Sequence, residues 1–182
     1  MQVKGTWITD YAKMIRANKD KDWNQYLTPE DWQIINAKIL SSAWYPYETF
    51  MRTGNAVFHE IAQQNLAVSR AFGKMFADNI AKVYKNIVIP GDPAASISKI
   101  YALQGTFFRD VPSVIAPVLH KKNRTVVQIS VTKLEREIGA PEAFAHQFMG
   151  MLERMLELVG VKKYSSEIRE VETGHELDLR WE

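Results

Sequence analysis

Four histidines are the residues of this chain best suited to bind a metal or haem, or to transfer protons near neutral pH. His59 and His146 each lie opposite the apolar stripe of a predicted helix, so we expect both rings to face solvent. His120 falls in a predicted polar turn and is also expected to be exposed. His175 shares the phase of the apolar residues in a predicted strand, so we expect a hydrogen-bonded, inward-facing ring rather than a cofactor ligand. No two histidines have a chelating spacing, and the sequence therefore predicts no metal site.

Pairs of carboxylates could serve as general acid and base, but only if they were buried. One group of glutamates surrounds predicted turns and a C-terminal hairpin, and a second group lies beside Arg154 on the polar side of a long predicted helix. Their spacing gives no sign of burial, so we predict that both groups are solvated surface charges. They are Glu135, Glu137, Glu167, Glu170 and Glu172 and, on the helix, Glu153 and Glu157.

Several kinds of chemistry are excluded by what the sequence lacks. The chain has no cysteine, which excludes disulfides, thiolate zinc sites, iron–sulfur clusters and cysteine nucleophiles. The patterns GxGxxG, GxxxxGK(S/T), HExxH and GxSxG do not occur. The sequence therefore predicts no catalytic residue and no metal ligand, and it favours a protein that is not an enzyme.

The aromatic residues are more informative. Four of the five tryptophans lie within the first 44 residues. The plain interpretation is a hydrophobic core. The alternatives are a pocket for an apolar or aromatic ligand between a helical layer and a sheet, or a homodimer contact. We predict that such a pocket would be lined by Trp44, Tyr45, Phe58, Phe72, Phe76, Tyr164 and His175.

Helical periodicity dominates the chain up to about residue 110. Helices are expected over residues 6–17, from residue 28 onward, and over 50–61, 66–87 and 94–107. The second of these begins with Thr28-Pro29-Glu30-Asp31, which has the form of a capping box with proline in the first turn. The buried sides of the second and fourth helices are predicted to include Trp32, Ile35, Ile39, Leu40, Phe72, Met75, Phe76, Ile80 and Val83.

From about residue 112 the apolar period changes to two, which is typical of strands. Residues 125–131 alternate and are predicted to pair with Val114–Leu119 through a turn at 120–124, with Pro117 placing the first strand at an edge. A long helix over 141–159 ends at Gly160, and a second hairpin joins 164–171 to 175–181. We predict an α+β fold in which a helical N-terminal half packs against a four-stranded antiparallel sheet. Residues 1–182 would form one domain, with the helical layer at about 5–110 and the sheet-plus-helix layer at about 112–182.

Composition restricts the partners and the location. The chain has 182 residues, 46% of them hydrophobic and 24% charged, which permits a sizeable core and excludes general disorder. The formal net charge of +2 argues against nucleic acid as a partner. The first residues do not form a signal peptide, and no apolar run approaches the roughly 20 residues of a membrane span. We expect a soluble, cytoplasmic protein.

The organisation resembles an uncharacterised bacterial domain family related in fold to haem nitric-oxide-binding domains, 4-vinyl reductase domains and TRAPP-type Golgi transport subunits. The likeness lies in Lys4-Gly5, Trp44-Tyr45-Pro46, Gly73, Gly160 and the terminal Leu177-Asp178-Leu179-Arg180-Trp181. The resemblance implies helices packed on a four-stranded sheet, a ligand cavity in some branches, and frequent dimers.

The resemblance implies haem as a cofactor. This sequence differs from the related families in two motifs, and both differences argue against haem. The nitric-oxide sensors use a helix histidine to bind haem and a Tyr-x-Ser-x-Arg motif for its propionates. Here Tyr164-Ser165-Ser166-Glu167 is the nearest match, and it lacks the arginine. The 4-vinyl reductase-type domains commonly carry C-terminal cysteines, which are absent here. The cofactor, if there is one, stays open.

Three functions remain as hypotheses. The first is a non-enzymatic, ligand-binding or signal-linked regulatory domain with a pocket for an apolar or tetrapyrrole-type ligand, acting as a homodimer or with a partner protein. The second is a structural adaptor that joins partners through an exposed apolar face. The third is an enzyme for apolar or tetrapyrrole substrates, which requires His175, Tyr164 and Arg180 to converge in one cavity.

Overall fold

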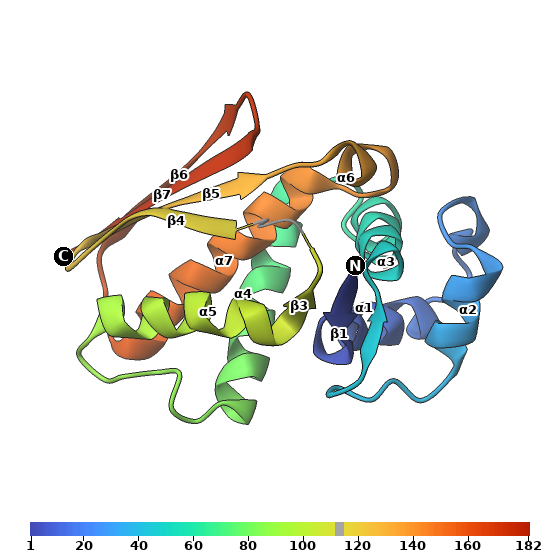
Figure 1. Ribbon diagram of the computed structural model, residues 1–182, viewed down its shortest axis with the longest axis horizontal. Helices are drawn as coiled ribbons and strands as arrows, with labels where there is room; N and C mark the ends of the chain where they lie inside the picture. The colour runs from blue at the N-terminus through green and yellow to red at the C-terminus, as the bar shows by residue number, and fades with distance from the viewer. Residues whose placement is uncertain (112–114) are drawn as a thin grey trace. The chain divides into compact units, whose positions relative to one another are not determined.

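The computed structural model describes residues 1–111 and 115–182 (Figure 1). The predicted limits at Pro112 and Val114 lie outside these residues. Helices and antiparallel sheets are both present, which confirms the α+β class. The chain forms two compact units, which are interleaved in sequence. Unit 1 holds residues 1–65, 104–111 and 133–140, and unit 2 holds residues 66–103, 115–132 and 141–182.

Unit 1 is mainly helical and contains a small sheet. Its helices are α1 (Gly5–Ala17), the 3-10 helix η1 (Trp23–Gln25), α2 (Pro29–Asn36), α3 (Tyr47–Glu60) and α6 (Lys133–Ile138). The short strands β1 (Gln2–Lys4), β2 (Trp44–Pro46) and β3 (Phe108–Arg109) form an antiparallel sheet in the order β2-β1-β3. Neither this sheet nor α6 was among the predicted elements. The strands have two or three residues each, too few for alternation to be visible in the sequence.

The start of α2 confirms the predicted capping box. The Thr28 hydroxyl accepts a hydrogen bond from the Asp31 amide, and the Asp31 carboxylate accepts one from the Thr28 amide at 2.9 Å. The buried Asp31 also binds Arg52 of α3 through two hydrogen bonds of 2.6 and 3.0 Å. The other end of α2 corrects a prediction. The helix ends at Asn36, and Leu40 lies beyond it with 51% of its surface exposed.

Unit 2 is a sheet packed on helices. It contains α4 (Leu66–Val83), most of α5 (Pro93–Phe107), α7 (Pro141–Val159) and the strands β4 (Ile115–Lys121), β5 (Arg124–Ser130), β6 (Tyr164–Val171) and β7 (Gly174–Trp181). The strands form a four-stranded antiparallel sheet, as predicted, and their order is β4-β5-β7-β6 (Figure 1). Pro117 lies in the edge strand next to a register shift, which confirms its expected position.

Helices α4 and α7 approach each other backbone to backbone. A Cβ atom on Gly73 would lie 1.8 Å from the carbonyl oxygen of Gln147, and one on Gly150 would lie 2.0 Å from that of Arg70. Glycine is required at both positions because no side chain fits. The outer side of α4 was predicted wrongly: Met75 is 39% exposed and Val83, its last residue, is 69% exposed.

Candidate functional site

The charged groups of α7 differ most from the sequence-based expectation. Glu153 was predicted to be solvated, yet it is buried and accepts hydrogen bonds of 2.9 and 2.5 Å from the Arg70 guanidinium of α4. It also accepts one of 2.6 Å from the Ser166 hydroxyl of β6. Glu135 of α6 in unit 1 is likewise buried and accepts a 2.6 Å hydrogen bond from Tyr47. These glutamates are paired because an unpaired buried charge is costly.

A second carboxylate lies one turn along α7. Glu157 accepts hydrogen bonds from Lys74 at 2.6 Å, from Tyr164 at 2.7 Å and from Arg154 at 2.9 Å. Burial by itself raises the pKa of Glu157, but these donors outweigh it and lower the pKa to about 2. Arg154 also donates to Asp78 of α4. The whole network is internally neutralised, so it has no free acid or base for catalysis.

The outer face of the sheet carries a different cluster. Asp178 of β7 is buried, and its carboxylate binds Arg124 of β5 and Arg180 of β7. Hydrogen bonds from these guanidiniums lower the pKa of Asp178 well below its usual range. Tyr164, by contrast, bonds to α7 on the opposite face. Tyr164 and Arg180 both line one small recess, but His175 is not among its lining residues, so the three side chains that the enzyme hypothesis required do not share that recess.

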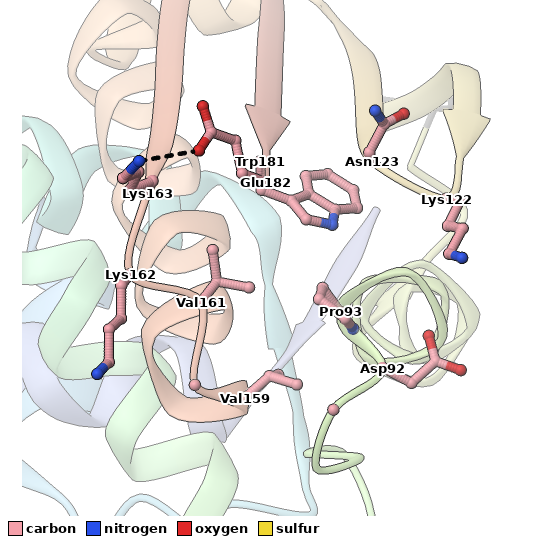
Figure 2. A pocket seen from close by; sticks show the side chains of 12 residues that line it. Asp92, Pro93, Lys122, Asn123, Val159, Val161, Lys162, Lys163, Trp181 and Glu182 are labelled. Carbon is pink, nitrogen blue, oxygen red and sulfur yellow. Dashed lines mark ion pairs between the residues drawn. The ribbon is translucent and has the colours of Figure 1, made fainter.

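A groove of about 1140 Å³ opens at one end of unit 2 (Figure 2). Apolar atoms come from Pro93, Val159, Val161 and Trp181. Around them lie Lys122 of the β4–β5 turn and Lys162 and Lys163 after α7, together with Asp92 and Glu182. Lys163 is paired with Glu182 at 3.3 Å, whereas the ion pairs of the described residues do not include Lys122 or Lys162. The groove can hold an apolar group and place cations beside it.

Sequence reasoning did not find this groove because its walls come from segments about 90 residues apart. The local signal was the helix C-cap at Gly160, which has a φ of +99° and turns the chain into the three groove residues that follow it. None of the predicted pocket residues lines the groove, and one of them, Tyr164, lines an adjoining recess.

The predicted pocket residues belong to both units. In unit 1, the Trp44 ring is stacked between Lys4 and Arg109, whose charged groups lie 4.0 and 4.2 Å from its centroid. The Tyr45 hydroxyl accepts a hydrogen bond from the Leu40 amide. Phe58, Phe72 and His175 are half-buried, and Phe76 is buried in the core of unit 2. Their joint role as a pocket stays a prediction.

The histidines are less exposed than expected. His59 is half-buried and stacks on Tyr26 with ring centroids 5.4 Å apart. His146 is half-buried, and desolvation followed by the Arg70 cation lowers its pKa. His120 belongs to β4 rather than to the turn, and its Nε2 lies 2.8 Å from the Ser98 hydroxyl and 2.9 Å from the Ala94 carbonyl oxygen. A carbonyl oxygen only accepts, so a hydrogen bond to Ala94 requires the tautomer with the proton on Nε2, and in that tautomer His120 is not a base for Ser98.

These residues do not fit haem as the resemblance implies it. The helical histidines among the described residues are His59 of α3, which stacks on Tyr26, and His146 of α7, which is half-buried with the Arg70 cation near it. The Tyr-x-Ser pair of β6 binds the protein's own carboxylates, Glu157 through Tyr164 and Glu153 through Ser166. These hydroxyls are therefore engaged and are not available to propionates. Within the described residues, no group of three or more His, Asp or Glu side chains could hold a metal ion.

No protein-family model matches the sequence, and no curated protein matches it. The structure is similar to solved H-NOX structures. The Fe(II) unliganded H-NOX protein from K. algicida has a TM-score of 0.66 at 10% identity, over 98% of this chain and 96% of that chain. An oxygen-binding H-NOX domain related to soluble guanylate cyclases has a TM-score of 0.58 at 9% identity, over 98% and 95% of the two chains. At these identities the likeness shows the fold alone, which is the haem NO-binding-like fold that the resemblance implied.

Proposed function

We propose that this chain is a non-enzymatic, ligand-binding regulatory domain that uses an H-NOX-like fold without histidine-ligated haem. The similar solved structures include an Fe(II) H-NOX protein and an oxygen-binding H-NOX domain, and each aligns with nearly the whole chain. The observation that carries the proposal is the groove of unit 2, with its apolar wall and lysine rim. Pockets that hold organic ligands have this composition, mainly apolar with a few polar groups at fixed positions.

The ligand is an apolar molecule, and its class includes tetrapyrroles that need no axial histidine. A fluorescence titration with 1-anilinonaphthalene-8-sulfonate tests the groove directly, since this dye brightens in apolar sites. We expect Val161→Asp, which places a carboxylate among the lysines and shrinks the apolar wall, to weaken dye binding about tenfold, the equivalent of roughly 1.4 kcal/mol. Val118→Asp is the matched control, because Val118 is 59% exposed on β4 and does not line the groove.

Haem is tested separately by adding hemin and removing the excess by gel filtration. We expect no retained Soret band of a histidine-ligated haem. A stoichiometric band that disappears in His59→Ala or His146→Ala would overturn the haem-free proposal. Equal dye binding by Val161→Asp and the wild type would overturn the assignment of the groove.

A structural adaptor is the second candidate. The observation that favours it is the exposure of Met75 and Val83 on α4. Met75→Lys would then reduce binding to a partner protein while leaving dye binding in the groove unchanged.

We further propose that the domain is related to the 4-vinyl reductase and TRAPP-type domains, belongs to the bacterial family it resembles, and acts in the cytoplasm as a homodimer or with a partner protein. None of the helices among the described residues is both long and apolar enough to cross a membrane.

A further inference from the structure

The outer face of the sheet places two arginines side by side. Arg124 of β5 and Arg180 of β7 are direct cross-strand partners, and Ser165 of β6 follows in the same row. Like charges in directly opposed positions repel each other and destabilise a sheet unless an opposite charge compensates them. This pairing therefore needs an explanation.

Asp178 supplies the compensating charge and also fixes the geometry. It lies on the same face of β7, two residues before Arg180. Arg124 donates to it from Nε at 2.9 Å and from Nη2 at 2.8 Å, and Arg180 donates from Nη2 at 2.8 Å. The Asp178 side chain is only 2% exposed, whereas those of Arg124 and Arg180 are 35% and 56% exposed. The carboxylate is thus a buried anchor that holds two guanidiniums toward solvent.

Both arginines keep hydrogen-bonding capacity. A guanidinium has five N–H donors, and the bonds to Asp178 use the Nε and Nη2 atoms. Among the described residues, no acceptor binds the Nη1 group of either arginine. Two cations and one anion leave this trio with a formal charge of +1. Arg169, the third arginine near Asp178, lies 3.8 Å from the Asp178 carboxylate and is more closely paired with Glu176 at 2.9 Å.

Arg180 lies beside the groove. A recess of about 240 Å³ is lined by Lys163, Tyr164, Ser165 and Arg180 and shares Trp181 with the groove. Glu182 also lines the recess and is paired with Lys163, while the Tyr164 hydroxyl donates to Glu157. The Arg180 guanidinium and the Ser165 hydroxyl can therefore donate to a ligand in the recess, and Arg124, the cross-strand partner of Arg180, extends the row beyond it.

We propose that Arg124 and Arg180 bind a phosphate group, carried by the ligand whose apolar part occupies the groove. The paired N–H donors of a guanidinium match the spacing of two phosphate oxygens. Two guanidiniums that one carboxylate already orients lose little conformational entropy when they bind a phosphate. The phosphate site stands on the arginine geometry alone, while its link to the groove rests on the proposed function. The phosphate belongs to a small soluble molecule or to a lipid headgroup, and the chemistry of recognition is the same.

The test is a titration with inorganic phosphate, followed through the arginine Nε–H resonances by NMR. We expect saturable shifts of Arg124 and Arg180 with a dissociation constant on the order of 1 mM, and a weakening of about tenfold in Arg180→Gln. Arg180→Lys keeps the charge and loses the fork, so it should recover only part of the affinity. Arg169→Gln is the matched control on the same face and should change the affinity less than twofold.

Absence of saturable shifts, or equal affinity of Arg180→Gln and the wild type, would overturn the phosphate site. Dye binding in the groove is measured on the same samples. It tests the proposed function separately from the phosphate titration, which tests the arginine site. If Arg180→Gln does not fold, as judged by circular dichroism, Arg124→Lys takes its place. Sedimentation with vesicles containing phosphatidic acid, dependent on Arg180, supports the site and assigns it to a lipid. Phosphate binding without sedimentation supports the site and assigns it to a soluble ligand.

Discussion

Buried carboxylates in this protein are held by donors from distant parts of the chain. Glu135 is 88 residues from Tyr47, and Glu153 is 83 residues from Arg70. Their burial could not be predicted from spacing, because nothing in the sequence near a glutamate identifies a partner so far away. The exposed positions of Glu137, Glu167, Glu170 and Glu172 confirm the prediction for these four residues. The ion pairs of Glu137 and Glu167 are with neighbours in sequence, Lys133 and Arg169.

The hydrogen bond from Tyr47 to Glu135 in unit 1 predicts how removal of the Tyr47 hydroxyl oxygen changes stability. Burial, together with the neighbouring carboxylate of Glu135, raises the pKa of Tyr47, so the hydroxyl stays protonated and donates. We expect Tyr47→Phe to lower the free energy of unfolding by about 1–3 kcal/mol, because a buried carboxylate loses a donor. Urea denaturation measures the difference. Tyr26→Phe is the control: the Tyr26 hydroxyl makes only a 3.4 Å hydrogen bond to Glu60, and its loss should cost less than about 0.5 kcal/mol.

The lowered pKa of Glu157 predicts that the protein loses stability in acid. Its folded pKa of about 2 is below the ordinary 4.5, so the unfolded chain takes up its proton first as the pH falls. The stabilisation is complete above about pH 5 and is lost between about pH 4.5 and pH 2. In Glu157→Gln the free energy of unfolding should be about 1–2 kcal/mol lower at pH 7 and should depend less on pH across this window. Equal pH dependence of wild type and variant would contradict the assignment; Glu142→Gln, an exposed residue of the same helix, is the control.

At the scale of elements, the local sequence pattern predicted the longer helices and strands. The two hairpins, the four-stranded antiparallel sheet and the helix over 141–159 were predicted from alternation, turn residues and periodicity within each segment, whereas the pairing of β5 with β7 joins distant segments and was not predicted. The sheet of β1, β2 and β3 was missed because its pairing joins residues 2–4 to 44–46 and 108–109. The groove was missed for the same physical reason, since it exists only after distant segments come together.

The glycines of α4 and α7 give a prediction about packing. Gly150→Ala places a methyl group about 2.0 Å from a carbonyl oxygen of α4, so the two helices must separate. We expect a loss of about 2–4 kcal/mol in the free energy of unfolding, because the contacts around both helices are disturbed. Gly105→Ala in α5 is the matched control. Apart from its chain neighbours and its own helix backbone, no atom of the described residues lies within 4 Å of the position that its methyl group would occupy, so this variant should gain about 0.5–1 kcal/mol from helix propensity.

At the scale of the whole molecule, the chain passes between the two units five times, near residues 65, 103, 132 and 140 and between the described residues 111 and 115. Helix α5 itself contributes residues to both units, since it spans Pro93–Phe107 and the division falls at Leu103. Helix formation is cooperative along a continuous helix. Unfolding one part of α5 therefore makes the helical state of the remaining part less stable. Length and composition predict that residues 1–182 fold as one domain, which requires the two units to unfold together.

Tryptophan positions allow that prediction to be tested. Four of the five tryptophans belong to unit 1, and only Trp181 belongs to unit 2. In Trp181→Phe, tryptophan fluorescence reports unit 1 alone, while circular dichroism in the far ultraviolet reports the helices of both units. Adding Gly150→Ala destabilises unit 2 without changing a residue of unit 1. If the chain unfolds as one domain, the fluorescence and dichroism transitions coincide and both move to lower urea in the double variant. A fluorescence transition that stays in place while part of the dichroism signal is lost earlier would show that the units unfold separately.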